Sequence, residues 1–173
     1  MDTRDTSTDR TAALAAPESG CDHPRRGVAL AALTGLLAPA LLRAQPAPVP
    51  MEVWKSPTCG CCKDWIDHVQ AHGFRVKVHD TGNTAVRERL MLPMKLGSCH
   101  TALVGRYAIE GHVPAADVVR LLKEAPDAVG LAVPGMPVGS PGMDGPQYAA
   151  RRDPFDVLLV ARDGSTRIFS SYR

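Results

Sequence analysis

Aromatic side chains and net charge are both scarce in this sequence. Phe, Trp and Tyr supply only 5% of its 173 residues, and 20 basic against 18 acidic residues leave a net charge of +2. No dense basic run is present, which excludes the charge pattern typical of a nucleic-acid-binding protein. Hydrophobic residues at 45% and charged residues at 22% are typical of a globular chain, and the length suits one hydrophobic core.

A long uninterrupted apolar run is also missing. The apolar stretch at residues 27–42 contains Pro39 and is shorter than the roughly 20 residues that a membrane-spanning helix needs. It directly follows Arg25 and Arg26, and Ala- and Pro-rich sequence comes after it. A basic segment, an apolar run and small residues stand in this order in a secretory signal.

This pattern predicts how the chain is divided. We expect residues 1–44 to be an export signal, cleaved after Ala40 or Ala44, and the paired arginines indicate the twin-arginine route to the periplasm. Residues 45–50 are then a linker, and residues 51–173 are one domain. No stable membrane span remains after the signal is removed; a retained N-terminal anchor helix is the alternative.

Hydrophobic periodicity in the rest of the chain alternates between strand and helix patterns. In chain order, we expect a strand at 51–55, a helix at 61–72, a strand at 74–79, a helix at 84–92, strands at 101–104 and 107–110, a helix from 114, and a terminal hairpin at 156–161 and 166–170. This order predicts an α/β fold with a thioredoxin-like mixed sheet flanked by helices. Residues 130–146 hold five Gly and four Pro, so we expect a long loop with a functional role there.

Three cysteines stand at the start of the first predicted helix. They are Cys59, Cys61 and Cys62, in the run Cys-Gly-Cys-Cys. A helix N-terminus favours the thiolate over the thiol, and three thiolates suit the soft Cu(I) ion. Cys59 and Cys62 also form a C-x-x-C, which can exchange disulfides, so a thiol-disulfide oxidoreductase acting on exported proteins is the alternative function. The third thiol would disturb that chemistry by forming other pairs.

A fourth thiol, Cys99, is followed by His100. In a thioredoxin-like chain the start of the third strand faces the C-x-x-C, so we expect these two side chains to meet the cysteine run. The alternative is that Cys99 is a small buried apolar residue. Zinc fits this chain less well than copper, because a structural Cys₄ site usually uses two C-x-x-C pairs. Two structural disulfides are a further alternative for an exported protein.

Weaker candidate ligands lie elsewhere in the chain. His112 precedes a predicted helix and could be either a ligand or a helix cap. His68 and His72 are four residues apart on a helix and could chelate a metal, but we expect a solvated face there. Three methionines in loops could be weak copper ligands or could fill gaps: Met94, Met136 and Met143.

Several separate motifs follow one another in the mature chain. They are Ser-Pro-Thr-Cys-Gly-Cys-Cys at 56–62, Gly-Ser-Cys-His-Thr at 97–101, Ile-Glu-Gly-His-Val-Pro at 109–114, Gly-Leu-Ala-Val-Pro-Gly-Met-Pro at 130–137 and Gly-Ser-Pro-Gly-Met at 139–143. Together they resemble the CopG-type periplasmic metal-binding proteins of copper-resistance operons, over about residues 51–170. The resemblance implies a thioredoxin-like fold, an exported location, and copper bound by the three neighbouring thiols together with other soft ligands.

The resemblance also implies a role in copper stress, in which Cu(I), and Cu(II) as a second state, would be handled alongside other copper-resistance proteins. It leaves open whether the chain stores, transfers or oxidises copper. If the chemistry is redox, Cys59 and Cys62 are the residues expected to carry it.

Overall fold

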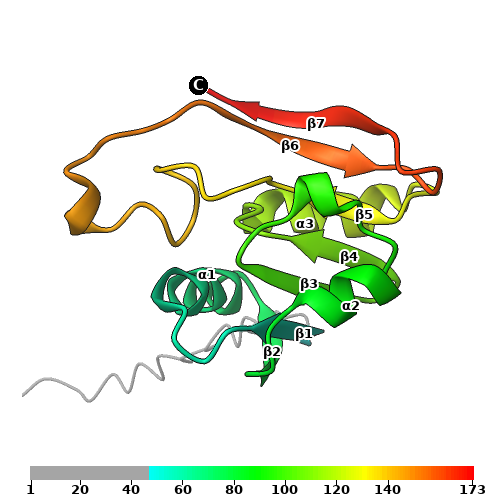
Figure 1. The fold of residues 1–173 in the computed structure, drawn as a ribbon, viewed down its shortest axis with the longest axis horizontal. Coiled ribbons are helices and arrows are strands. Elements are labelled where there is room, and N and C mark those ends of the chain that lie inside the picture. The colour runs from blue at the N-terminus through cyan, green and yellow to red at the C-terminus, as the bar shows by residue number, and fades with distance from the viewer. Residues whose placement is uncertain (1–46) are drawn as a thin grey trace, which may run out of the picture. The chain divides into compact units, whose positions relative to one another are not determined.

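The computed structural model describes residues 47–173, so the predicted export signal at 1–44 lies outside the described residues. The elements in chain order are β1 (Val49–Lys55), α1 (Gly60–Ala71), β2 (Phe74–His79), α2 (Thr84–Arg89), η1 (Met94–Leu96), β3 (His100–Val104), β4 (Tyr107–Glu110), α3 (Ala115–Glu124), β5 (Gly130–Ala132), η2 (Pro146–Tyr148), β6 (Phe155–Val160) and β7 (Thr166–Tyr172) (Figure 1). Within these residues, none of the helices is long and apolar enough to cross a membrane.

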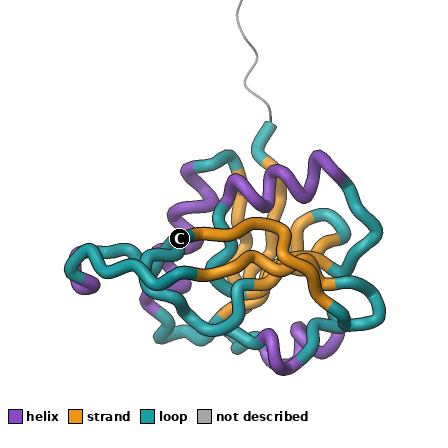
Figure 2. The backbone as a smooth tube through the Cα atoms, turned by 90° about the horizontal axis from the view of Figure 1, so that it is seen from above, coloured by secondary structure: helices purple, strands orange, loops and turns teal. Residues whose placement is uncertain are grey.

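The strands form one mixed sheet of seven in the order β2-β1-β3-β4-β5-β6-β7. The pairs β1/β2 and β4/β5 are parallel, and the other neighbouring strands run antiparallel. The strands gather in the middle of the molecule and the helices lie around them (Figure 2). This architecture confirms the predicted fold class, including the hairpin at the C-terminal end, which is β6 and β7.

Helix α1 covers the sheet with the face that the sequence pattern predicted. Its buried residues are Cys62, Trp65, Ile66 and Val69. Trp65 is fully buried, and its indole Nε1 donates a hydrogen bond to the Val113 carbonyl oxygen at 2.9 Å. Burying a side chain of this size removes a large apolar surface from water, and the hydrogen bond satisfies its one polar atom. The helix that carries the cysteine run is therefore held firmly on the core.

Most elements differ from their predicted bounds by one to three residues, among them α2 and β1. The helix predicted at 84–92 ends at Arg89, and Met91 adopts a left-handed backbone conformation with φ 57° shortly before Pro93. The first strand begins at Val49, so the end of the predicted linker belongs to the sheet. In both cases the chain follows contacts and backbone geometry that periodicity does not report.

The Gly/Pro-rich segment is only partly a loop. Gly130–Ala132 forms strand β5 and pairs in parallel with β4. A Cβ atom at Gly130 would lie 1.7 Å from the Ala108 carbonyl oxygen, so this close approach requires glycine. Residues 133–154 then form the long connection to β6, which extends away from the sheet in Figure 1.

Candidate metal centre

The cysteine run stands at the beginning of α1. Cys59 is the N-cap residue of the helix, Cys61 lies in its first turn, and Cys62 points into the core with no exposed surface. Cys59 and Cys62 are joined by a disulfide, whereas Cys61 and Cys99 are free thiols. The site therefore has one cysteine pair that can open on reduction and two thiols that are already available.

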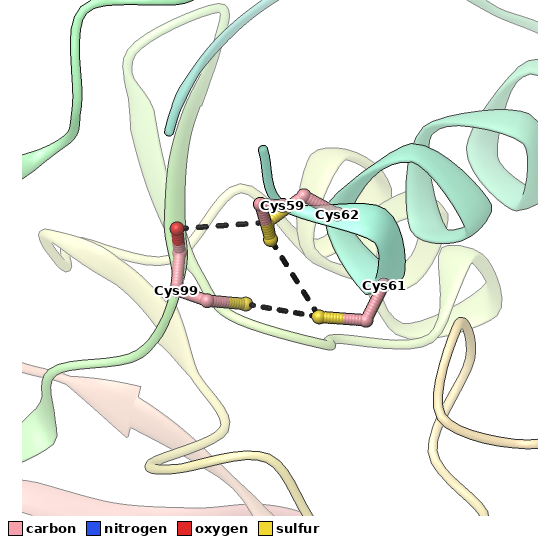
Figure 3. A group of neighbouring side chains, drawn as sticks. All are labelled: Cys59, Cys61, Cys62 and Cys99. Atoms are coloured by element: carbon pink, nitrogen blue, oxygen red, sulfur yellow. Dashed lines mark hydrogen bonds between the residues drawn. A yellow bond between two sulfur atoms is a disulfide. The ribbon is translucent and has the colours of Figure 1, made fainter. Parts of the chain in front are cut away.

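Cys99 meets this run, as expected from the topology. Its Sγ lies 3.8 Å from Cys61 Sγ, and Cys61 Sγ lies 3.6 Å from Cys59 Sγ (Figure 3). The reason is the strand register: β1 and β3 are antiparallel, with Lys55 opposite His100, so the residue after β1 and the residue before β3 emerge at the same end of the sheet. The sulfur atoms of all four cysteines lie within 4.8 Å of one another.

Two histidines complete the other side of the site. His112 Nε2 lies 3.1 Å from Cys99 Sγ, and His100 Nδ1 lies 3.4 Å from the same sulfur. Both rings have no exposed surface. Cys99, His100 and His112 form a second group whose donor atoms lie within 4.8 Å of one another. Cys99 thus belongs to both groups, and its half-exposed position between them differs from that of a core residue.

A backbone carbonyl orients the His112 ring. Its Nδ1 lies 2.8 Å from the carbonyl oxygen of Pro141 in the long loop, so Nδ1 carries the proton and donates it. The lone pair of the neutral ring is then on Nε2, the atom that faces Cys99. Carbonyl oxygens fix metal-binding histidines in this way in many metal sites.

The His100 ring is fixed mainly by packing, with its Nδ1 facing Cys99 Sγ. Its ring lies against Trp65 with a centroid separation of 4.3 Å. Its buried Nε2 has no hydrogen-bond partner among the described residues. A buried polar atom without a partner is costly. The nitrogen of this ring that faces Cys99 is Nδ1, so Nδ1 is the atom placed to share a metal ion with that thiol.

Burial sets the protonation of these side chains. It raises the pKa of the Cys99 thiol to about 12, and the neighbouring Cys61 thiol adds to this effect. It lowers the pKa of His112 and holds the pKa of His100 well below its usual range, in that ring with help from the neighbouring His112. At neutral pH both imidazoles are neutral and can offer a lone pair, whereas Cys99 must give up a proton to become a thiolate ligand.

The structure separates the three predicted methionines. Met94 and Met136 expose 61% and 51% of their surface to solvent. Met143 is buried, and its Sδ accepts a hydrogen bond from the Tyr148 hydroxyl at 3.3 Å. Of the three, Met143 lies in the loop segment that packs on α1, because a Cβ atom at Gly142 would be 2.6 Å from the Cys61 carbonyl oxygen.

The pair His68 and His72 is engaged in structural contacts. His68 Nε2 accepts a hydrogen bond from the backbone N–H of Ala115 at 3.1 Å and so caps α3. His72 Nδ1 lies 2.7 Å from the His68 carbonyl oxygen. Capping of α3, the alternative role expected for His112, is thus supplied by His68. The contact could not be predicted because His68 is far from α3 along the chain.

The donor set fits a soft metal ion. It consists of thiols and neutral imidazoles and contains no carboxylate. Such a donor set binds copper in preference to hard cations. With the disulfide closed, the free donors are the Cys61 and Cys99 thiols and the two imidazoles. Reduction of the disulfide adds the Cys59 and Cys62 thiols, so the number of available sulfur donors depends on the redox state of this pair.

Comparisons with known proteins point in the same direction. Two solved structures described as copper resistance protein copG, form 2 and form 1, are each 45% identical to this chain. The alignment with form 2 covers 73% of this chain and 99% of the other, with a TM-score of 0.68; for form 1 the values are 72%, 98% and 0.67. The family described as "Protein of unknown function, DUF411" matches residues 96–143, which include Cys99, His100 and His112. A comparison with curated proteins finds no match.

Proposed function

We propose that this chain, which belongs to the CopG family of copper resistance proteins, binds Cu(I) as its cargo through Cys59, Cys61, Cys62 and Cys99. The observation that carries the proposal is the meeting of four sulfur atoms within 4.8 Å of one another at the first turn of α1. Cu(I) accepts two or three sulfur ligands and bridging thiolates, so such a compact group can hold more than one ion. His100 and His112 are additional ligands on the Cys99 side.

The protein's own residues account for the binding step. Cys61 and Cys99 release their thiol protons, while His112 needs no deprotonation because its Nε2 already presents a lone pair. The Pro141 carbonyl keeps that ring in the required tautomer. Cu(II) is the second state that we propose for this site, favoured by its imidazole nitrogens when the disulfide removes two thiolates.

We propose further that the protein acts in the periplasm and exchanges copper with other copper-resistance proteins. The support is the order of Arg25-Arg26, the apolar run and the small residues before residue 45, which is that of an export signal. Residues 1–44 are then removed, and the mature chain begins near Gln45. N-terminal sequencing of protein recovered from the periplasm checks both the compartment and the cleavage site.

Anaerobic titration of the reduced mature protein with Cu(I), against a competing chelator, tests copper binding. Wild type should take up copper tightly, and Cys59→Ser/Cys61→Ser/Cys62→Ser should lose most of this uptake because only one thiol of the group remains. Unchanged far-UV circular dichroism of the variant serves as the control for folding. If the triple variant keeps wild-type stoichiometry and affinity, copper does not bind at this site.

The disulfide between Cys59 and Cys62 favours a second candidate function, thiol-disulfide exchange with exported proteins. In this reaction the reduced Cys59–Cys62 pair converts a substrate disulfide to two thiols and becomes a disulfide itself, with Cys59, the more exposed sulfur, attacking first. Disulfide reductase activity that survives Cys61→Ser and disappears in Cys59→Ser would support it. If both variants keep full disulfide reductase activity, this second function is excluded.

A further inference from the structure

A buried ion pair lies directly behind the loop that carries Cys99. The Glu110 side chain has no exposed surface and that of Arg87 is 8% exposed. Arg87 Nη2 and Nε lie 2.8 and 3.0 Å from Glu110 Oε1. Replacing a buried ion pair by apolar residues of similar volume is often neutral or stabilising, so stability alone is a weak reason for this pair.

The ion pair holds both backbone groups of Ser98, the residue before Cys99. The Ser98 N–H donates to Glu110 Oε1 at 2.7 Å, and Arg87 Nη2 donates to the Ser98 carbonyl oxygen at 2.7 Å. The second carboxylate oxygen of Glu110 accepts a hydrogen bond from the Thr101 hydroxyl. Both oxygens of Glu110 are therefore occupied by the protein, and the residue is not free to bind a metal ion.

The contacts of Arg87 and Glu110 lie at the end of the β3/β4 ladder, so a small backbone shift there would move the candidate ligands. Thr101 and Glu110 are the last opposed pair of the β3/β4 ladder. Cys99 is two residues before Thr101 and His112 is two residues after Glu110, so the two side chains that lie 3.1 Å apart extend from this pair. The fixed end of the ladder therefore determines how closely Cys99 and His112 approach.

The backbone around this point is too closely packed to shift independently. Gly111 has φ 72°, and a Cβ atom there would lie 2.5 Å from Ser98 Oγ. A Cβ atom at Gly97 would lie 3.1 Å from Arg87 Nη1. The Ser98 hydroxyl also donates to the Gly135 carbonyl oxygen, which joins the long loop to the same point.

We infer that Arg87 and Glu110 are positioning residues that fix the sulfur of Cys99 between Cys61 and His112. For its copper readout this inference rests on the proposed function, since it explains how that site is preorganised. Hydrogen-bonded groups outside the ligand set orient the ligands, and their substitution typically lowers metal affinity by about 10- to 100-fold. Loss of the contacts of Arg87 and Glu110 with Ser98 should therefore lower Cu(I) affinity by an amount in that range.

The first test is Glu110→Gln, which keeps the size of the side chain and removes its charge. We expect Cu(I) affinity to fall by about 10- to 100-fold. The matched control is Asp117→Asn, another buried carboxylate, whose partners Ser170 and Tyr172 belong to β7. The control should lose stability but keep wild-type copper affinity, and equal affinity losses in both variants would overturn the inference.

The second readout needs no metal. In the protein with its disulfide closed, Cys61 and Cys99 are the free thiols of the described residues, and the ratio of their alkylation rates by iodoacetamide is measured by mass spectrometry. Weakening the hold on Ser98 should expose Cys99 and raise the Cys99 to Cys61 ratio several-fold in Glu110→Gln but not in Asp117→Asn. An unchanged ratio would overturn the positioning role.

The two readouts separate the possible failures. If wild type binds no Cu(I) but Glu110→Gln still raises the alkylation ratio, the proposed function fails and the positioning of Cys99 stands.

If Glu110→Gln does not fold, Arg87→Met/Glu110→Leu removes both charges at similar volume and should retain the fold. That double variant should show the same rise in the Cys99 ratio, and a wild-type ratio in it would overturn the inference.

Discussion

The two halves of the candidate metal centre are built in different ways. The thiol half, Cys59 to Cys62, lies within four consecutive residues at the start of one helix, and a disulfide already joins two of its members. The imidazole half, Cys99, His100 and His112, comes from the ends of two strands, and its histidines are fully buried. We infer that redox chemistry controls how many ligands the first half offers, whereas packing and hydrogen bonds control where the ligands of the second half lie.

Cys99 is the residue on which this comparison depends most, because its sulfur lies close to the donor atoms of both halves. We expect Cys99→Ser to lower Cu(I) affinity by more than the ~10- to 100-fold typical of substitutions outside the ligand set. It should also cost more than one equivalent of bound copper if the sulfur atoms bridge several ions. Anaerobic Cu(I) titration measures both, with Cys61→Ser as the matched variant in the thiol half. Wild-type binding by Cys99→Ser would show that the thiol half works alone.

The histidines should have smaller effects than Cys99. His112→Ala removes a neutral nitrogen that lies 3.1 Å from Cys99 Sγ, and we expect an affinity loss nearer the lower end of the ~10- to 100-fold range. His100→Ala should have a similarly modest effect. His72→Ala, which alters an exposed ring on the far end of α1, is the control and should bind like wild type. A loss in His112→Ala as large as in Cys99→Ser would make the imidazole half the main site.

The buried histidines should also make the metal-free protein sensitive to acid. Burial lowers the pKa of His100 in the folded state from its ordinary 6.5, so below about pH 6.5 the unfolded chain binds a proton that the folded chain does not. Stability conferred by the neutral ring is therefore present above pH 6.5 and is lost as the pH falls, by about 1.4 kcal/mol per pH unit for each such histidine.

Urea unfolding between about pH 7.5 and pH 5 measures this dependence. His100→Leu should show a shallower loss of stability with acid than wild type, because one of the buried rings is gone. Some dependence should remain, since burial also lowers the pKa of His68 and His112. If stability falls equally steeply with acid in His100→Leu and in wild type, burial of His100 does not contribute to the acid sensitivity.

Local patterns in the sequence predicted most of the secondary structure. The period of 3.6 residues in α1 identified its buried face, Cys62, Trp65, Ile66 and Val69, because neighbours on a helix have a fixed spacing. The Cys-Gly-Cys-Cys run stands at the helix start for the same local reason. Strand β5 escaped prediction, since Gly130 becomes part of a strand only through its contact with Ala108 of β4.

The sequence by itself determined the donors: three thiols in one helical turn, a fourth before a strand, and a histidine in the motif that precedes α3. Copper binding by these residues stays a prediction. The tertiary structure alone decided how the donors are oriented, through the Pro141 carbonyl on His112 and the Arg87–Glu110 pair on Ser98. The physical reason is distance along the chain: local spacing fixes geometry over a few residues, whereas these contacts join residues 11 to 29 positions apart and depend on strand register and loop packing.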